Sequence, residues 1–191
     1  MRPGERPPEE IEVKLPCADL GAVRRTLQQK GASSVSGLHD EVNDLFDDAE
    51  RRLSARGAAL RLRRAGGRSL LTYKGPAQFV SGVKVREERE TEVQDPDAVR
   101  AILVGLGFVP TFRYEKRREE WSFEGCAVAL DETPIGRFVE VEGEPTAIRR
   151  AVAALSLDFS EAIPYSYARL YVDLRSKDPA LPPDMVFSRT S

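Results

Sequence analysis

Charged and branched apolar residues alternate strictly over residues 10–15, just after the proline-rich start of the chain. A repeat of two is the repeat of a β-strand, so Glu10, Glu12 and Lys14 share one face and the apolar residues between them share the other. Two carboxylates and an ammonium, spaced about 7 Å apart along a strand, can hold a divalent metal next to a phosphate. An exposed edge strand with its polar face outward gives the same pattern, so this segment alone leaves both interpretations open.

The same alternation recurs along most of the chain. Paired glycines at Gly66-Gly67 and the dipeptide Glu124-Gly125 indicate hairpin turns between such segments. Besides the first strand, the pattern predicts strands over residues 43–47, 60–64, 69–74, 83–93, 113–123, 126–131 and 138–142.

Amphipathic helices separate some of these strands. Asp19, Asp95 and Thr146 are predicted helix starts, because each precedes an apolar repeat of helical spacing. Further helical pattern covers residues 147–155 and 165–175. A strand followed by a turn and a short helix thus occurs more than once, which predicts an α+β protein with one large antiparallel sheet.

The polar faces of the predicted strands carry long ionisable side chains. An open antiparallel sheet places such a face in solvent, but surface strands favour Thr and Ser, whereas Glu and Lys are mildly depleted in strands. A sheet closed into a barrel with a charged, wet lumen explains the composition better. The acids on these faces are Glu10, Glu12, Glu88, Glu90, Asp131, Glu140 and Glu142, and the bases are Lys14, Arg61, Arg63, Lys74, Lys84, Arg86, Lys116 and Arg118.

This mixture of side chains suits a polyphosphate with its metal. Carboxylates supply the hard oxygen ligands that Mg²⁺ or Mn²⁺ prefer. Arginine and lysine bind phosphate oxygens, arginine in bidentate fashion.

Composition narrows the alternatives. Of 191 residues, 31% are charged, against roughly 25% in a typical domain, yet the net charge is only −2. Acids and bases are therefore balanced, which argues against a nucleic-acid partner. No apolar run approaches the roughly 20 residues of a membrane span, and residues 1–8 do not have the pattern of a signal peptide, so we expect a cytoplasmic protein. We expect a flexible N-terminus over residues 1–8, a folded domain over 9–175 and a frayed tail over 176–191.

Taken in order, the charged motifs resemble those of a known family. The chain is similar to the CYTH superfamily, also called triphosphate tunnel metalloenzymes, which includes class IV adenylate cyclases, thiamine triphosphatases and inorganic tripolyphosphatases. The resemblance covers residues 9–175. It rests on Glu10-x-Glu12-x-Lys14, Asn43–Asp47, Ala59–Arg63, Thr72–Lys74, Arg86-x-Glu88-x-Glu90, Lys116-x-Arg118-x-x-Trp121, Val128–Asp131, Gly136–Glu142 and Tyr167–Leu170. Leu45 departs from it, since many members have tyrosine there.

The resemblance implies a closed antiparallel eight-stranded barrel, a triphosphate tunnel, with helices packed outside. It implies that Glu10, Glu12, Glu140 and Glu142 hold Mg²⁺ or Mn²⁺, with Asp131 and Glu90 near the metal. It further implies that the triphosphate is bound by Lys14, Arg61, Arg63, Lys74, Arg86, Lys116 and Arg118. Lys14, Glu12 and Glu142 are the candidate catalytic residues.

Two reactions fit this residue set. The first hypothesis is a metal-dependent triphosphatase acting on tripolyphosphate, thiamine triphosphate or a nucleoside triphosphate. The alternative is a class IV adenylate cyclase that converts ATP to cyclic AMP and pyrophosphate. A binding module without turnover, and an exposed charged sheet with no site, are the non-enzymatic alternatives. The expected partner is a small-molecule triphosphate, with no nucleic acid and no membrane; the oligomeric state is left open, a homodimer included.

Overall fold

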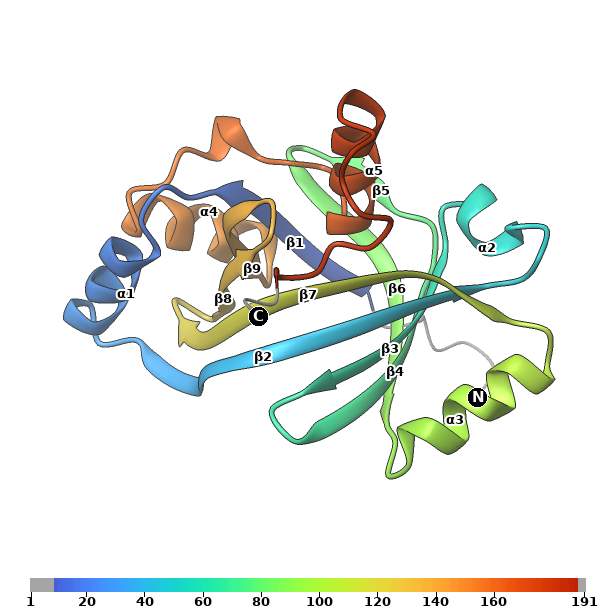
Figure 1. The fold of residues 1–191 in the computed structure, drawn as a ribbon. Helices are drawn as coiled ribbons and strands as arrows, with labels where there is room; N and C mark the ends of the chain where they lie inside the picture. The colour runs from blue at the N-terminus through green and yellow to red at the C-terminus, as the bar shows by residue number, and fades with distance from the viewer. Residues whose placement is uncertain (1–8, 189–191) are drawn as a thin grey trace.

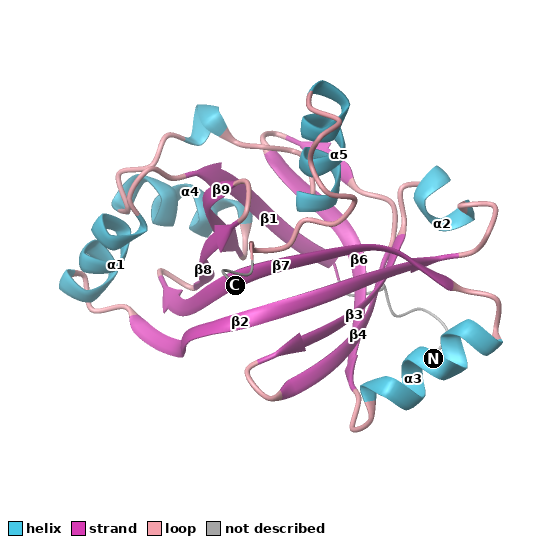
Figure 2. Cartoon of the chain, viewed as in Figure 1, coloured by secondary structure: helices cyan, strands magenta, loops and turns pink. Residues whose placement is uncertain are grey.

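The computed structural model describes residues 9–188, and its centre is one antiparallel sheet (Figures 1 and 2). The bounds of the strands match most of the alternating segments. The strands are β1 (Glu9–Pro16), β2 (Ser33–Asp47), β3 (Ala59–Ala65), β4 (Arg68–Lys74), β5 (Gln78–Val80), β6 (Val83–Glu92), β7 (Val109–Phe123), β8 (Cys126–Thr133) and β9 (Gly136–Glu142).

The sheet closes on itself through β1. Neighbouring strands follow the order β1-β9-β8-β7-β2-β3-β4-β6, and β6 pairs back onto β1. Glu12 therefore lies between Glu142 of β9 and Lys84 of β6. The short strand β5 pairs with β6 beside this ring. The prediction of a closed eight-stranded antiparallel barrel in an α+β fold is confirmed, with β5 as an additional strand.

Within the described residues, five α-helices and one 3₁₀ turn surround the barrel. They are α1 (Leu20–Gln29), α2 (Arg52–Ala55), α3 (Pro96–Gly105), α4 (Pro145–Ala154), the turn Phe159–Glu161 and α5 (Tyr167–Lys177).

Side-chain caps explain where two of these helices begin. The Asp19 carboxylate accepts a hydrogen bond from the backbone N–H of Ala22, and Asp95 accepts from Asp97 and Ala98, as the sequence predicts for helix starts. The prediction for Thr146 was wrong, because α4 begins at Pro145, whose fixed φ suits the first helical residue, and the capping position is Glu144.

The main hydrophobic core lies outside the barrel. Apolar faces of β1, β8 and β9 pack under α1 and α4, which lie together on one side of the molecule (Figure 1). Leu27, Val139 and Ile148 are fully buried in this layer. A smaller core beneath α3 contains Phe46 and Leu62. Burying the apolar face of the strands outward leaves the charged face to the lumen.

The C-terminal segment does not fray. Met185 is fully buried, and backbone hydrogen bonds join it to Arg113 and Glu115 of β7. Its side chain packs with Tyr114 and Tyr171 in an aromatic cluster beneath α5. The prediction of a frayed tail was wrong for residues 178–188, because burial of this methionine and two backbone hydrogen bonds offset the entropy of ordering the segment.

Strand β2 begins ten residues earlier than its alternation predicts. Residues 33–42 carry serine, glycine and histidine rather than a clear apolar face, yet they pair with β7 across several register shifts. Pairing with a long neighbour, rather than local propensity, extends the strand. Within residues 9–188, no helix is long and apolar enough to cross a membrane.

Candidate active site

Closure of the barrel turns the alternating charged positions toward one lumen. Lys14 of β1 lies opposite Glu140 of β9, and Glu12 lies opposite Glu142 in the same pair of strands. On the other edge of β1, Glu10 lies opposite Arg86 of β6. Strand pairing thus brings residues far apart in sequence onto one inner surface.

A cavity of about 1090 Å³ occupies the lumen. Among the residues lining it are Lys84 and Glu88, which the sequence placed on the inner face. Asp131 is fully buried and does not line the cavity. The other predicted site residues all line it, namely Glu10, Glu12, Lys14, Arg61, Arg63, Lys74, Arg86, Glu90, Lys116, Arg118, Glu140 and Glu142.

Ion pairs run from strand to strand around the lumen. Lys14 pairs with Glu140, which also accepts a hydrogen bond from Arg118. Burial alone would raise the pKa of Glu140, but Lys14, Lys116 and Arg118 hold that pKa well below its usual range. Glu140 is therefore an anion already neutralised by cations.

Asp131 lies behind these cations and fixes two of them. Its carboxylate accepts hydrogen bonds from Arg118 at 2.7 Å and from Lys116 at 3.1 Å. The Tyr167 hydroxyl of α5 donates to the same carboxylate at 2.8 Å. With both oxygens occupied and no access to the cavity, Asp131 is placed to orient the phosphate-binding cations.

The ion pairs continue on the other side of the barrel. Arg63 donates to Glu90 at 2.9 Å, and Arg61 lies 3.5 Å from the same carboxylate. Lys74 joins Glu88 at 2.6 Å to Glu10 at 2.8 Å. Cations and anions thus alternate from Lys14 around the barrel to Glu10, with Glu12–Lys84 as a separate pair.

The residue that connects the two sides is Glu41 of β2, which sequence reasoning missed. It is 2% exposed and lies 3.4 Å from both Lys116 and Arg63. The only available signal was parity: Glu41 and Asn43 precede Leu45 at alternate positions on β2, where the predicted strand was too short to include Glu41. Two further missed residues are Tyr114, which accepts a hydrogen bond from Arg61, and Tyr167.

Of the residues predicted to face the lumen, Arg86 and Glu142 make no ion pair within residues 9–188. Arg86 donates to the backbone carbonyl of Gly75 at 3.0 Å through Nε. Glu142 faces the open cavity, and partial burial together with the negative charges of Glu10 and Glu12 raises its pKa to about 7. Negative charge is therefore in excess around Glu142.

A divalent cation bound near Glu142 would neutralise this excess of negative charge. Within residues 9–188, no three carboxylate, histidine or cysteine side chains are already arranged as a metal site, because lysines and arginines occupy most of the carboxylates. The donor set around Glu142, with Glu10 and Glu12 nearby, consists of hard oxygens and fits Mg²⁺ or Mn²⁺.

Part of the cavity has a different lining. Leu45, Phe112 and Tyr171 line the cavity and belong to one apolar and aromatic cluster, which forms the apolar end of the cavity. The Phe112 and Tyr171 rings lie 5.8 Å apart between centroids. This end offers contacts to an organic group rather than to phosphate.

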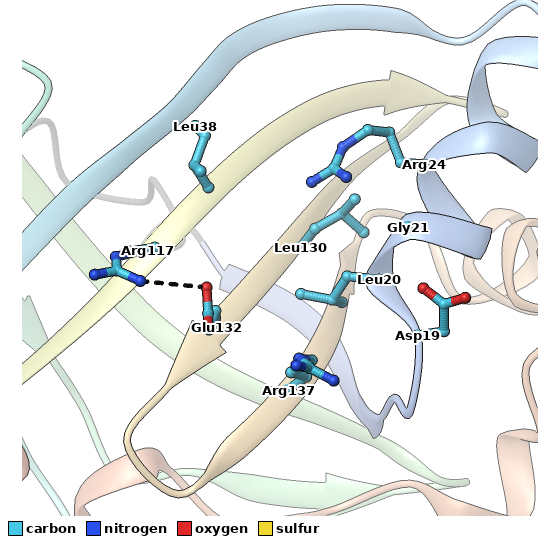
Figure 3. Close-up of a pocket in the computed structure, with 9 residues that line it drawn as sticks. All are labelled: Asp19, Leu20, Gly21, Arg24, Leu38, Arg117, Leu130, Glu132 and Arg137. Carbon is cyan, nitrogen blue, oxygen red and sulfur yellow. Dashed lines mark ion pairs between the residues drawn. The ribbon is translucent and has the colours of Figure 1, made fainter. Parts of the chain in front are cut away.

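A second cavity, of about 290 Å³, lies outside the barrel beside α1 (Figure 3). Arg24, Arg117 and Arg137 surround it, and Arg117 lies 3.7 Å from Glu132, the pair marked in the picture. None of the predicted site residues lines it. The candidate site is therefore the lumen.

The fold and the site define a tunnel protein, a closed antiparallel barrel whose lumen carries alternating acids and bases. The chain belongs to the CYTH domain family, whose model matches residues 8–188.

Individual relatives agree with this assignment. A candidate adenylate cyclase of Methanocaldococcus jannaschii is 30% identical over 134 residues, which cover 70% of this chain and 75% of the relative. The solved structure of a Pyrococcus horikoshii protein matches this chain with a TM-score of 0.71 and 28% sequence identity. The match covers 87% of this chain and 99% of the other. A candidate adenylyl cyclase of Hippeastrum, described as having a dominant triphosphatase activity, has a TM-score of 0.66 at 22% identity, covering 91% and 98%.

Proposed function

We propose that this protein is a Mg²⁺- or Mn²⁺-dependent enzyme that hydrolyses a phosphoanhydride bond of a small-molecule triphosphate. The observation that carries the proposal is that one cavity, the lumen, is lined by all of the predicted cations and by all of the predicted carboxylates except Asp131. A metal-loaded triphosphate needs both kinds of residue, since phosphoryl transfer depends on positioning and charge neutralisation more than on covalent help.

The ion pairs suggest how the lumen accepts such a ligand. Without it, Lys14, Lys74 and Arg63 are neutralised by the carboxylates beside them. With a triphosphate bound, these cations would turn to phosphate oxygens. The released carboxylates Glu10 and Glu140 would then hold the metal together with Glu12 and Glu142. Phosphate oxygens would replace the carboxylates as partners of the cations, and the metal would replace the cations as the partner of the carboxylates. The charges in the lumen would therefore stay balanced.

The chain's own residues then have distinct roles. Arg61, Arg63 and Arg118 would grip non-bridging oxygens and stabilise charge on the leaving phosphate. Lys14 lies beside Glu140 and within the reach of Glu12, so it would bind the phosphate nearest the metal. The metal, when bound, supplies charge neutralisation and lowers the pKa of a water molecule. Glu142 would share in holding the metal, whose positive charge would oppose the rise in pKa that burial and the nearby carboxylates cause in the metal-free protein.

A second candidate function is cyclisation of ATP to cyclic AMP and pyrophosphate. The apolar end of the cavity favours it, because Leu45, Phe112 and Tyr171 could contact an adenine ring beyond the phosphates. The Methanocaldococcus relative is named for this activity, whereas the Hippeastrum neighbour has triphosphatase activity on the same fold.

Product analysis distinguishes the two. The purified protein is incubated with Mg²⁺ or Mn²⁺ and, separately, with tripolyphosphate, thiamine triphosphate and ATP. Orthophosphate release supports hydrolysis, and cyclic AMP with pyrophosphate supports cyclisation. If none of the three substrates gives a metal-dependent product, the proposal of a triphosphate-acting enzyme is wrong.

A further inference from the structure

Like Asp131, Glu41 is buried behind the cations of the lumen, whereas Glu10, Glu12, Glu140 and Glu142 line the cavity. It lies on β2 directly opposite Lys116 of β7, and its side chain is 2% exposed. It does not line the cavity, whereas both of the cations that it contacts do. Glu41 therefore stands behind Lys116 and Arg63, on the side away from the space where a ligand would bind.

The contacts of Glu41 with cations are longer than the Asp131–Arg118 contact on the same wall of the barrel. Lys116 Nζ lies 3.4 Å from Oε2, Arg63 Nη1 lies 3.4 Å from Oε1, and His39 Nε2 lies 3.8 Å from Oε1. Asp131, by contrast, accepts hydrogen bonds from Arg118 at 2.7 Å. Glu41 Oε2 has no hydrogen bond of good geometry among the described residues. It acts on its neighbours mainly through its charge.

That charge is permanent at working pH. Burial alone would raise the pKa of Glu41, but Lys116, Arg118 and Arg63 together hold it well below its usual range. The surrounding cations thus meet a fixed internal anion whether or not the cavity is filled. A phosphate chain entering the cavity would attract the same cations from the opposite side.

We propose that Glu41 is an internal counter-ion that stabilises the ligand-free barrel and thereby limits the affinity of the lumen for polyphosphate. This inference rests on the proposed function. In the ligand-free state Glu41 helps to neutralise Lys116 and Arg63. Removing its charge leaves each of these cations with one carboxylate fewer, although Lys116 keeps Asp131 and Arg63 keeps Glu90. In the bound state phosphate oxygens supply that neutralisation, so the loss of Glu41 costs less. By linkage, the variant without this charge binds polyphosphate more tightly.

A purely architectural role gives a different result. If Glu41 only supported the fold, its loss would lower stability equally with and without ligand, and affinity would not change. If Glu41 only aimed Lys116 and Arg63 at the ligand, its loss would weaken binding. Tighter binding together with lower stability of the free protein distinguishes the counter-ion from both.

The test compares Glu41→Gln with the wild type by isothermal titration with imidotriphosphate and Mg²⁺, a tripolyphosphate analogue whose imido bridges resist hydrolysis. Thermal unfolding is recorded with and without the analogue. We expect the free variant to melt at a lower temperature and to bind the analogue about fivefold or more tightly. Glu119→Gln is the matched control, because Glu119 is also a buried, ion-paired glutamate of the barrel wall but contacts Arg24 outside the lumen. It should lose stability without gaining affinity.

Equal or weaker binding by Glu41→Gln would overturn the inference. If that variant does not fold, Glu41→Asp replaces it: the carboxylate then stands one methylene farther from Lys116 and Arg63, and a smaller change in the same directions is required. A wild type that does not bind the analogue would instead overturn the proposed function, and the inference with it.

Discussion

The ammonium group of Lys14 lies 3.9 Å from the centre of the Tyr167 ring. Lys14 belongs to the first strand and Tyr167 to the last helix, and the Tyr167 hydroxyl donates to Asp131 on a third element. Helix α5 therefore does more than cover the barrel, since it contributes a side chain that touches a cation and an anion of the lumen. A cation over an aromatic face is stabilised by the ring quadrupole, which helps hold Lys14 in its buried position.

Replacing Tyr167 with phenylalanine tests this contact. The variant keeps the ring over Lys14 but leaves Asp131 with one hydrogen bond fewer, so we expect the free energy of unfolding to fall by about 1–3 kcal/mol. Urea unfolding measures it. Tyr165→Phe, a change at a half-exposed tyrosine nearby, is the control and should have little effect. Equal stability of Tyr167→Phe and wild type would show that the hydroxyl contributes nothing.

Glu142→Gln should abolish metal-dependent turnover while the protein stays folded. Glu142 makes no ion pair among residues 9–188, so its loss breaks no buried pair, but it removes an oxygen charge from the proposed metal site. Phosphate release with Mg²⁺ or Mn²⁺ and circular dichroism measure the two properties. Glu132→Gln, at a carboxylate outside the lumen, is the control. Full activity in Glu142→Gln would refute the metal assignment.

Arg63→Ala should chiefly weaken binding of the phosphate chain. A charge-assisted hydrogen bond contributes about 1.5–3 kcal/mol, so we expect KM to rise roughly 10- to 100-fold with a smaller change in kcat. Steady-state kinetics with tripolyphosphate measure both constants. Unchanged KM and kcat would mean that Arg63 does not contact the substrate.

Phe112→Ala separates an organic substrate from an inorganic one. Phe112 lines the cavity, and it packs with Leu45 and Tyr171 in the aromatic cluster beneath α5. If that end binds a base, the variant loses kcat/KM with ATP and keeps it with tripolyphosphate. Equal losses of kcat/KM with both substrates would show that Phe112 does not contact an organic group of the substrate.

The raised pKa of Glu142 predicts a pH dependence of stability in the metal-free protein. The pKa is about 7 in the folded protein against a usual 4.5, so between these values the folded state holds a proton that the unfolded chain has released. The contribution of Glu142 to stability is present below about pH 4.5 and is lost as pH rises through about 7. Urea unfolding in EDTA at several pH values should show the wild type losing stability relative to Glu142→Gln over this range. A difference that is constant with pH would contradict the prediction.

Much of the site could be predicted because strand periodicity assigns each residue to a face. Glu10, Glu12 and Lys14 alternate with apolar residues. Because the apolar face must be buried in a hydrophobic core, the charged residues are assigned to the opposite face. The same parity placed Arg61 and Arg63, and Glu140 and Glu142, on one surface. These positions now line a single cavity.

Strand periodicity could not predict how deeply a side chain is buried or which residues it contacts. Asp131 shares the inner face but lies behind Lys116 and Arg118, where the cavity does not reach it. Glu41 lies in a part of β2 whose local pattern is too weak to predict a strand. Met185 was assigned to a frayed tail, although it is fully buried against β7.

By itself, the sequence determined which residues of each strand face inward, and with them the chemistry of the lumen, because alternation is a local property of the chain. The tertiary structure decided which acid neutralises which base, that β1 closes the barrel against β6, and that Tyr167 of α5 reaches the lumen. Those features depend on contacts between residues many positions apart, whose distances are set by strand register and barrel closure rather than by any local pattern.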